Sequence, residues 1–348
     1  MQMHEIGRIT VSRIGIGCWS FGGGEYWGAQ SQREVERIVR SALEEGVNFF
    51  DTARMYNDGA SEKSLGQALE GVRHKAIVCS KVSPAKSYRD TLRYECEQSL
   101  KNLGTDYIDI YMMHWPANPM GLRHFTDDEA VLANPPAAEE TFLALEELRK
   151  EGKIREIGLS NYGLVQMREA ISICPEIAVN ELPYNIISRA IEAEIMPFCM
   201  ENGISVVSSM TLQQGVLAGI YDHAEDIPPS QAHSRHFKQE RGQGASRHNE
   251  EGAEDEVFET VAVLKRLAAG MDVTPAQLSI AWALNNSGIA CALVGSRSED
   301  ELAENIGAAR LSLAANVLSE IDAVSQKVLA KLGRSPDYYE NSSSSRIY

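Results

Sequence analysis

Short apolar runs alternate with longer amphipathic segments along most of the chain. Val47–Phe50 (VNFF) has the length and composition of a buried strand. Gln32–Glu45 has apolar residues at helical spacing, and Gly46 follows it as a stop signal. The other strand-length runs are Arg13–Cys18, Ala76–Ser80, Tyr107–Met112, Ile154–Leu159, Ile177–Leu182, Ile204–Ser208 and Ile289–Val294. The other helical segments are Ser61–Leu69 with Ser61 as N-cap, Tyr88–Leu103, Ala137–Glu151, Leu164–Ile173, Ile191–Glu201 and Asp300–Ala308.

This alternation predicts the fold class. Strands that alternate with helices favour a parallel sheet, and about eight such steps over a chain of this length favour a closed (β/α)₈ TIM barrel. An open doubly wound sheet is the alternative, but its strand–G-x-G-x-x-G–helix fingerprint is missing, because Gly22–Gly24 lead into a polar loop. We therefore expect one α/β barrel domain over residues 1–348, with a core at about 14–310 and a C-terminal helix and tail at 311–348.

One long segment interrupts the alternation. Residues 221–256 follow the seventh strand and are polar, and we expect a lid, a binding loop or disorder there. The four histidines of this loop fit no metal motif, and we expect them to be solvated: His223, His233, His236 and His248. Arg235 and Arg241 either reach a cofactor phosphate or lie on the surface. The tail at 341–348 is of low complexity, and we expect it to be mobile.

Composition and charge narrow the partners. Apolar residues make up 43% of the chain, which is enough for a sizeable core, and the net charge of −16 argues against nucleic acid. The first ten residues lack the apolar run of a secretory signal, and no run of about 18 apolar residues predicts a membrane span, so we expect a cytoplasmic protein. The six cysteines form no C-x-x-C pair, which favours free thiols over a metal site.

Polar side chains follow several of the predicted strands, where the carboxyl ends of barrel strands meet at one rim. They are Asp51, Tyr56, Lys81, His114, Ser160 and Asn161. Hydride transfer to a carbonyl leaves an alkoxide that needs a proton. A tyrosine beside a lysine becomes a better acid, a carboxylate keeps the lysine charged, and a histidine can orient the carbonyl oxygen. Each residue alone has an ordinary structural explanation, and their joint placement carries the argument.

Five stretches resemble conserved blocks of the aldo-keto reductases. They are Gly46–Leu69 (GVNFFDTARMYNDGASEKSLGQAL), Asp106–Pro116 (DYIDIYMMHWP), Lys153–Tyr162 (KIREIGLSNY), Asn180–Asn185 (NELPYN) and Ala292–Ala309 (ALVGSRSEDELAENIGAA). The resemblance extends from about Gly15 to Ala309 and is in register with the predicted strands and helices. It implies an NAD(P)(H)-dependent oxidoreductase that reduces an aldehyde or ketone to an alcohol.

The resemblance also assigns roles. Tyr56 would be the general acid, Lys81 paired with Asp51 would lower its pKa, and His114 would orient the carbonyl. Ser160, Asn161 and Glu181 would bind the carboxamide of the nicotinamide, and Tyr184 would stack on its ring. The expected contacts of the pyrophosphate and the adenosine end are Gly215, Leu217, Gly295, Ser296, Arg297, Glu301 and Asn305.

The chain departs from the family pattern at three places. Glu181 stands where the family often has Gln, and a carboxylate there accepts a hydrogen bond but cannot donate one. Residues 209–212 (SMTL) replace a block like Y-S-P-L, which removes a serine contact to phosphate. Glu301 would repel an adenosine 2′-phosphate, whereas Arg297 would bind it. We expect NADP(H), with NAD(H) as the alternative.

The substrate is less well defined. Trp19, Trp27 and Trp115 are candidates for its walls, and such walls would suit a small sugar or sugar-derived carbonyl. One alternative function is a redox-sensing, cofactor-binding module that resembles the potassium-channel β subunits. Metal-assisted hydrolysis is a third, disfavoured because no H-x-H ligand set occurs. The tail motif SPDYYE at 335–340 could serve a homo-oligomer, and the sequence does not decide this.

Overall fold

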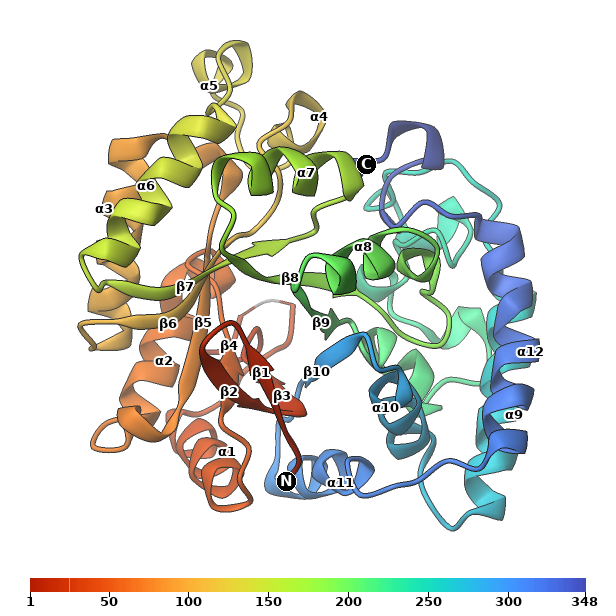
Figure 1. The fold of residues 1–348 in the computed structure, drawn as a ribbon. Coiled ribbons are helices and arrows are strands. Elements are labelled where there is room, and N and C mark those ends of the chain that lie inside the picture. The colour runs from red at the N-terminus through yellow and green to blue at the C-terminus, as the bar shows by residue number, and fades with distance from the viewer. Residues whose placement is uncertain (25) are drawn as a thin grey trace.

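The protein is described by a computed structural model that covers residues 1–24 and 26–348. Its centre is a closed barrel of parallel strands in the order β10-β3-β4-β5-β6-β7-β8-β9, as the sequence predicts (Figure 1). The barrel strands are β3 (Ile14–Gly17), β4 (Phe49–Asp51), β5 (Ile77–Val82), β6 (Ile108–Met113), β7 (Ile154–Ser160), β8 (Ile177–Pro183), β9 (Ser205–Ser209) and β10 (Ile289–Val294).

A short hairpin closes the amino-terminal end of the barrel. Strands β1 (Met3–Ile6) and β2 (Ile9–Ser12) pair antiparallel, and Gly7 makes their turn with φ of 56°. Ile6 and Val11 pack into the barrel interior with inward-facing residues of the strands, such as Ile110. The hairpin was not predicted. It leaves the opposite end of the barrel, where the strands finish, for the site.

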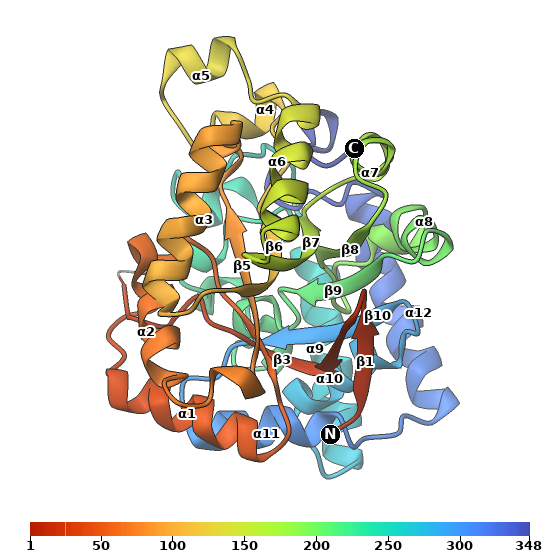
Figure 2. The same ribbon diagram turned by 60° about the vertical axis from the view of Figure 1, so that its left-hand side comes forward.

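Helices surround the barrel and cover its outer face (Figures 1 and 2). They are α1 (Gln32–Glu44), α2 (Ala60–Ala68), α3 (Arg89–Leu103), α4 (Pro119–Leu122), α5 (Glu129–Ala133), α6 (Ala138–Lys150), α7 (Leu164–Ile173), α8 (Ile195–Glu201), α9 (Glu254–Gly270), α10 (Pro275–Asn285), α11 (Glu299–Ala308) and α12 (Ala315–Leu332). The sequence analysis missed α9 and α10 between the seventh and eighth barrel strands. Within the described residues, no helix combines the length and apolar character that crossing a bilayer requires.

Helix α2 begins differently from the prediction. Its N-cap is Gly59, with φ of 81°, and Ser61 lies inside the helix. The Ser61 hydroxyl instead donates to the carbonyl of Cys18 at 2.7 Å and lies 2.7 Å from the Thr52 hydroxyl. Ser61 thus ties the helix to the ends of two strands, which fixes the loop that follows β4.

The long loop is packed, and the prediction of solvated histidines is wrong for two of the four, whereas His223 is exposed as expected and His233 is half-buried. It runs through the 3₁₀ turns η6 (Ala224–Asp226), η7 (Pro229–Gln231) and η8 (Gln239–Gly242). His236 and His248 are buried. The His236 ring stacks on Tyr338, and its Nε2 lies 3.0 Å from the carbonyl oxygen of Ile187. These residues anchor the loop to the rest of the fold.

The two loop arginines are engaged by protein groups. Arg235 is 1% exposed, so it is not a surface residue, and it pairs with Glu250 at 2.6 Å. Arg241 pairs with Glu254 at 3.1 Å and with Glu225. Both arginines are therefore paired with carboxylates of the loop and of α9.

The tail is docked, which contradicts the expectation of mobility. Its Arg346 is buried and forms a two-pronged ion pair with Asp337, at 2.7 and 2.8 Å. The backbone oxygen of Tyr348 accepts a hydrogen bond from the Val165 amide at 3.0 Å, beside the start of α7 (Figure 2). Arg346 also lies 3.9 Å from the ring centre of Trp115, so the tail reaches the segment that follows β6.

Candidate active site

The carboxyl ends of β4 and β5 bring an acid, a lysine and a tyrosine together. Lys81 in β5 is fully buried, and its Nζ donates to both oxygens of Asp51, at 2.5 and 2.6 Å. The same nitrogen lies 3.2 Å from the carbonyl oxygen of Thr52 and 3.3 Å from the hydroxyl of Tyr56. The ammonium therefore has protein partners for all of its protons and joins Asp51 to Tyr56.

The loop that carries Tyr56 is fixed by its neighbours. Tyr56 begins the 3₁₀ turn η1 (Tyr56–Gly59), and the next residue, Asn57, has φ of 50°, which an asparagine tolerates. The Asn57 amide donates to the carbonyl oxygens of Trp19 and Phe21, at 2.9 and 3.0 Å. The loop after β3 therefore holds the loop after β4, and with it the Tyr56 hydroxyl.

The charge state of the site follows from burial and these contacts. Burial lowers the pKa of Lys81, but the charges of Asp51 and Glu181 together raise it by more. The pKa therefore lies well above its usual value, and the lysine is an ammonium. Burial raises the pKa of Tyr56, and Lys81 opposes this only in part, so the phenol keeps its proton at neutral pH. Lys81 does lower the pKa of Tyr56, as expected from the sequence, but burial outweighs this effect, so a net lowering is not found.

His114 directly follows β6 and faces Tyr56, with ring centres 5.6 Å apart. It is 8% exposed, and burial followed by the nearby Lys81 lowers its pKa well below the usual value. The imidazole is therefore neutral at pH 7. Its Nδ1 is buried without a hydrogen-bond partner in the described part of the chain.

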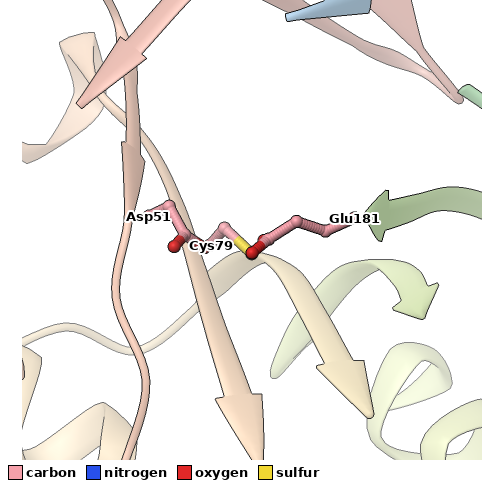
Figure 3. Close-up of side chains that lie close together, drawn as sticks. All are labelled: Asp51, Cys79 and Glu181. Atoms are coloured by element: carbon pink, nitrogen blue, oxygen red, sulfur yellow. The ribbon is translucent and has the colours of Figure 1, made fainter. Parts of the chain in front are cut away.

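Glu181 joins this group from the opposite wall of the barrel. It extends from β8 toward Asp51 and Cys79 (Figure 3), and its Oε2 lies 3.4 Å from the Lys81 Nζ. Burial, followed by the charge of Asp51, raises the pKa of Glu181 to about 8. Ligand atoms of Asp51, Cys79 and Glu181 lie within 4.8 Å of one another. The Lys81 ammonium already occupies this place and neutralises Asp51. We therefore interpret the three groups as the surroundings of the buried lysine and not as a metal site.

Ser160, Asn161 and Glu181 lie side by side at the ends of β7 and β8. Ser160 pairs with Glu181 in register, and the Asn161 amide N–H donates to the Glu181 carbonyl at 2.9 Å. Asn161 has φ of 61°, and its side chain donates to the His114 carbonyl at 3.1 Å. The predicted carboxamide-binding residues are therefore adjacent to one another and to His114.

Tyr184 does not belong to this rim, contrary to the prediction. Its side chain is 1% exposed, and its ring stacks on Trp282 of α10 with ring centres 5.4 Å apart. Its hydroxyl donates to Glu192 and accepts from Asn286, both at 2.8 Å. A ring enclosed in this way offers no face to a ligand, because the strand directs it outward among the helices.

The segment after β9 makes a tight turn. It forms the 3₁₀ turn η5 (Gln213–Ala218), in which Gly215 has φ of 97°, a conformation that favours glycine. Gly215 is partly exposed. The side chain of Leu217 is fully buried, and its N–H bonds to the Leu212 carbonyl, so a ligand contact from Leu217 is contradicted.

Residues near the start of α11 form the predicted adenosine-binding group. Asn305 donates to Ser296 at 3.1 Å, and Gly295 has open space where a Cβ would lie. Ser298 caps α11, and the Glu301 carboxylate accepts from the Arg297 amide at 2.8 Å. The side chains of Arg297 and Glu301 are both exposed at this edge.

Aromatic rings of the first loop pack beside Tyr56. Trp19 stacks on Tyr26 and on Tyr56, with ring centres 4.9 and 5.9 Å apart, and Trp27 meets Trp19 edge to face at 5.4 Å. Tyr26 was not predicted individually, although it lies in the glycine-rich loop next to Trp27. Its hydroxyl accepts from Gln214 at 2.7 Å and donates to the Ser230 carbonyl at 2.9 Å, which links the first loop to the long loop.

Comparison with known proteins decides the family. A model described as the aldo/keto reductase family matches residues 13–326. The chain belongs to the aldo/keto reductase family. As a member of it, the chain is an NAD(P)-dependent oxidoreductase that acts on carbonyl groups. Its Asp51, Tyr56 and His114 stand in the blocks on which the resemblance was based, and Lys81 lies between two of these blocks.

Individual relatives of this aldo-keto reductase cover nearly all of it. The NADH-specific methylglyoxal reductase of Escherichia coli is 31% identical over 348 residues, 93% of this chain and 96% of that protein. Aldo-keto reductase YhdN of Bacillus subtilis is 30% identical and covers 84% of each chain. A crystal structure of an aldo/keto reductase from Klebsiella pneumoniae with NADP and acetate matches with a TM-score of 0.71, 25% identity, and 93% and 95% coverage.

Proposed function

We propose that this aldo-keto reductase reduces a small aldehyde or ketone to an alcohol, with Tyr56 as the proton donor. The observation that carries the proposal is the hydrogen-bonded series Asp51–Lys81–Tyr56, in which Lys81 Nζ lies 3.3 Å from the Tyr56 hydroxyl. The bound nicotinamide supplies the hydride for the carbonyl carbon. The oxygen then accepts the Tyr56 proton, and the adjacent ammonium stabilises the phenolate that remains.

His114 complements Tyr56 in this scheme. Because its pKa is lowered well below the usual value, the ring is neutral and can donate one N–H to the carbonyl oxygen without adding charge. Asp51 keeps Lys81 in place and charged and does not itself touch the substrate. Two hydrogen-bond donors from different loops would therefore converge on the reacting oxygen.

The residues present fit a nicotinamide cofactor. Glu181 Oε2 is a buried polar atom without a hydrogen-bond partner in the described ranges, and Gly295 leaves room for a close approach to the backbone. Ser160, Asn161 and Glu181 would hold the carboxamide, and Ser296 and Asn305 the adenosine end. Gly215 would lie against the pyrophosphate. NADP(H) is the expected cofactor and NAD(H) the alternative, because Arg297 and Glu301 act in opposite directions on a 2′-phosphate.

The aromatic wall favours a small substrate. Trp19, Tyr26 and Trp27 pack against one another beside the Tyr56 ring, where they would narrow the approach of a substrate to its hydroxyl. A small aldehyde with an adjacent oxygen function, either a 2-oxoaldehyde or a short sugar, suits such a wall. Its C–H face can lie against the aromatic rings while its carbonyl oxygen points to Tyr56. A relative is named for methylglyoxal, which is of this kind.

Oxidation of NADPH and NADH, followed at 340 nm with a series of aldehydes, tests the proposal. The series comprises methylglyoxal, glyceraldehyde, longer sugar aldehydes and a generic aromatic aldehyde. We expect turnover that is greatest with one of the first two. Tight cofactor binding without turnover of any aldehyde would contradict the enzymatic proposal and favour a cofactor-binding regulatory module.

A further inference from the structure

The buried site contains one more carboxyl group than its lysine can neutralise. Asp51 takes both short contacts to Lys81, and Glu181 lies 3.4 Å from the same nitrogen with its Oε2 otherwise unpartnered in the part of the chain described. The side chains of these three residues are 0 to 6% exposed. Two ionised carboxylates and one ammonium would leave a net negative charge in the barrel interior, which is unfavourable.

Among the residues that the structure describes, the surroundings of Glu181 offer no second cation. The ionisable groups that face it or lie beside its lysine come from several elements: Asp51 of β4, Cys79 and Lys81 of β5, Tyr56 of η1, His114 after β6, and Cys291 of β10. Of these, only Lys81 carries positive charge at neutral pH. The proton on Glu181 therefore restores neutrality, and its pKa is raised to about 8 by burial and by Asp51.

A neutral Glu181 can also do what a carboxylate cannot. The sequence alone suggested a residue that only accepts hydrogen bonds. Protonated, the side chain has one O–H donor beside its carbonyl oxygen, so like an amide it can both donate and accept, although it has one donor hydrogen where an amide has two. The backbone of Glu181 pairs with Ser160 and accepts from the Asn161 amide, so its side chain starts next to the residues expected to hold the carboxamide, and its carboxyl group also faces Asp51.

We propose that Glu181 is a positioning residue whose protonation is coupled to the redox state of the cofactor. It is a neutral acid beside the uncharged, reduced nicotinamide. It releases its proton to solvent more readily beside the oxidised nicotinamide, because its carboxylate then balances the positive charge of the ring. This inference rests on the proposed function, since it requires the nicotinamide to bind next to Ser160 and Asn161.

The coupling predicts that pH changes the relative affinity for the two redox forms. As pH rises from 6.5 to 9.5, the dissociation constant of NADPH divided by that of NADP⁺ should increase at least about tenfold, because NADP⁺ binds relatively more tightly. This is the size expected for two charges several ångströms apart at an effective dielectric constant near 20. NADH and NAD⁺ should give the same trend. The titration of the 2′-phosphate cancels in the ratio.

The dissociation constants can be measured by quenching of tryptophan fluorescence in the wild-type protein and in two variants. Glu181→Gln keeps the shape and the ability to donate a hydrogen bond but cannot titrate, and we expect its ratio to be independent of pH. Glu156→Gln is the matched control. Glu156 accepts from the Arg8 amide at 2.9 Å at the other end of the barrel, and this variant should behave like wild type.

Proton release provides a second measurement. Addition of NADP⁺ in weak buffer at pH 7.5, with a pH indicator, should release a fraction of a proton from wild type and none from Glu181→Gln. An equal pH dependence in wild type and Glu181→Gln would overturn the proposal. Absence of cofactor binding to the wild-type protein would instead contradict the proposed function, on which this inference depends.

Discussion

Removal of the Asp51 charge tests whether Glu181 can replace it as the partner of Lys81. Lys81 lies 2.5 Å from Asp51 and 3.4 Å from Glu181. At an effective dielectric constant of 20, those distances correspond to attractions of about 7 and about 5 kcal/mol. In Asp51→Asn we expect Glu181 to lose its proton and pair with Lys81. The variant should then lose about 2 kcal/mol of stability.

The double variant Asp51→Asn/Glu181→Gln has no such replacement. Removing the partner of a buried charge costs about 3–5 kcal/mol, and we expect a loss in that range. Glu181→Gln alone should not lower stability at pH 7. In the folded wild-type protein the pKa of Glu181 is raised to about 8 from its usual 4.5, so wild type loses stability as pH rises between those values and the variant does not.

Urea unfolding of the four proteins at pH 7, followed by circular dichroism, gives the coupling free energy. We expect the double variant to lose about 1–3 kcal/mol more than the sum of the single variants, because each carboxyl group can replace the other. Additive losses, with no coupling beyond about 0.5 kcal/mol, would refute the shared role of Asp51 and Glu181.

Three further substitutions test other parts of the site. Glu301→Arg replaces an exposed repulsive charge by an attractive one, and the ratio of kcat/KM for NADPH over NADH should rise at least about fivefold; an unchanged ratio would show that Glu301 does not face the 2′ position. Trp19→Ala removes the ring that stacks on Tyr56, and KM for the aldehyde should rise more than kcat falls; unchanged kinetics would exclude Trp19 from the substrate wall. Gly163→Ala places a Cβ 2.2 Å from the Tyr348 backbone oxygen and should release the tail; hydrogen exchange of residues 335–348 as slow as in wild type would contradict this.

The barrel and its polar rim were predictable because both depend on local patterns. Apolar runs such as Val47–Phe50 predict strands, and the order of elements places Asp51, Lys81 and His114 at the same end. The hairpin at residues 3–12 was missed, although Ile6, Ile9 and Val11 flank a glycine turn, because four-residue strands are too short for a clear alternation. Helices α9 and α10 were not predicted; α9 begins at Glu254, inside the polar segment at 221–256, so its start has no clear boundary in the sequence.

The remaining differences come from contacts between distant segments, which local patterns do not contain. His236 has the sequence context of a solvated loop residue, but Tyr338, about a hundred positions later, covers its ring. Tyr184 lies in a block with a rim residue and yet points outward to Trp282. The pKa of Tyr56 also depends on such packing. The sequence shows the nearby Lys81, which lowers this pKa, but it does not show the burial of Tyr56, which raises the pKa by more.

The most direct test of the account compares Tyr56→Phe with Tyr107→Phe. Tyr107 lies at the opposite end of the barrel between Arg73 and Arg155, where its hydroxyl makes no hydrogen bond to the described residues. With the best aldehyde and saturating NADPH, Tyr56→Phe should lower kcat about 10²–10⁴-fold without changing the dissociation constant of the cofactor, and Tyr107→Phe should match wild type. A kcat within about twofold of wild type in Tyr56→Phe would contradict its assignment as the proton donor.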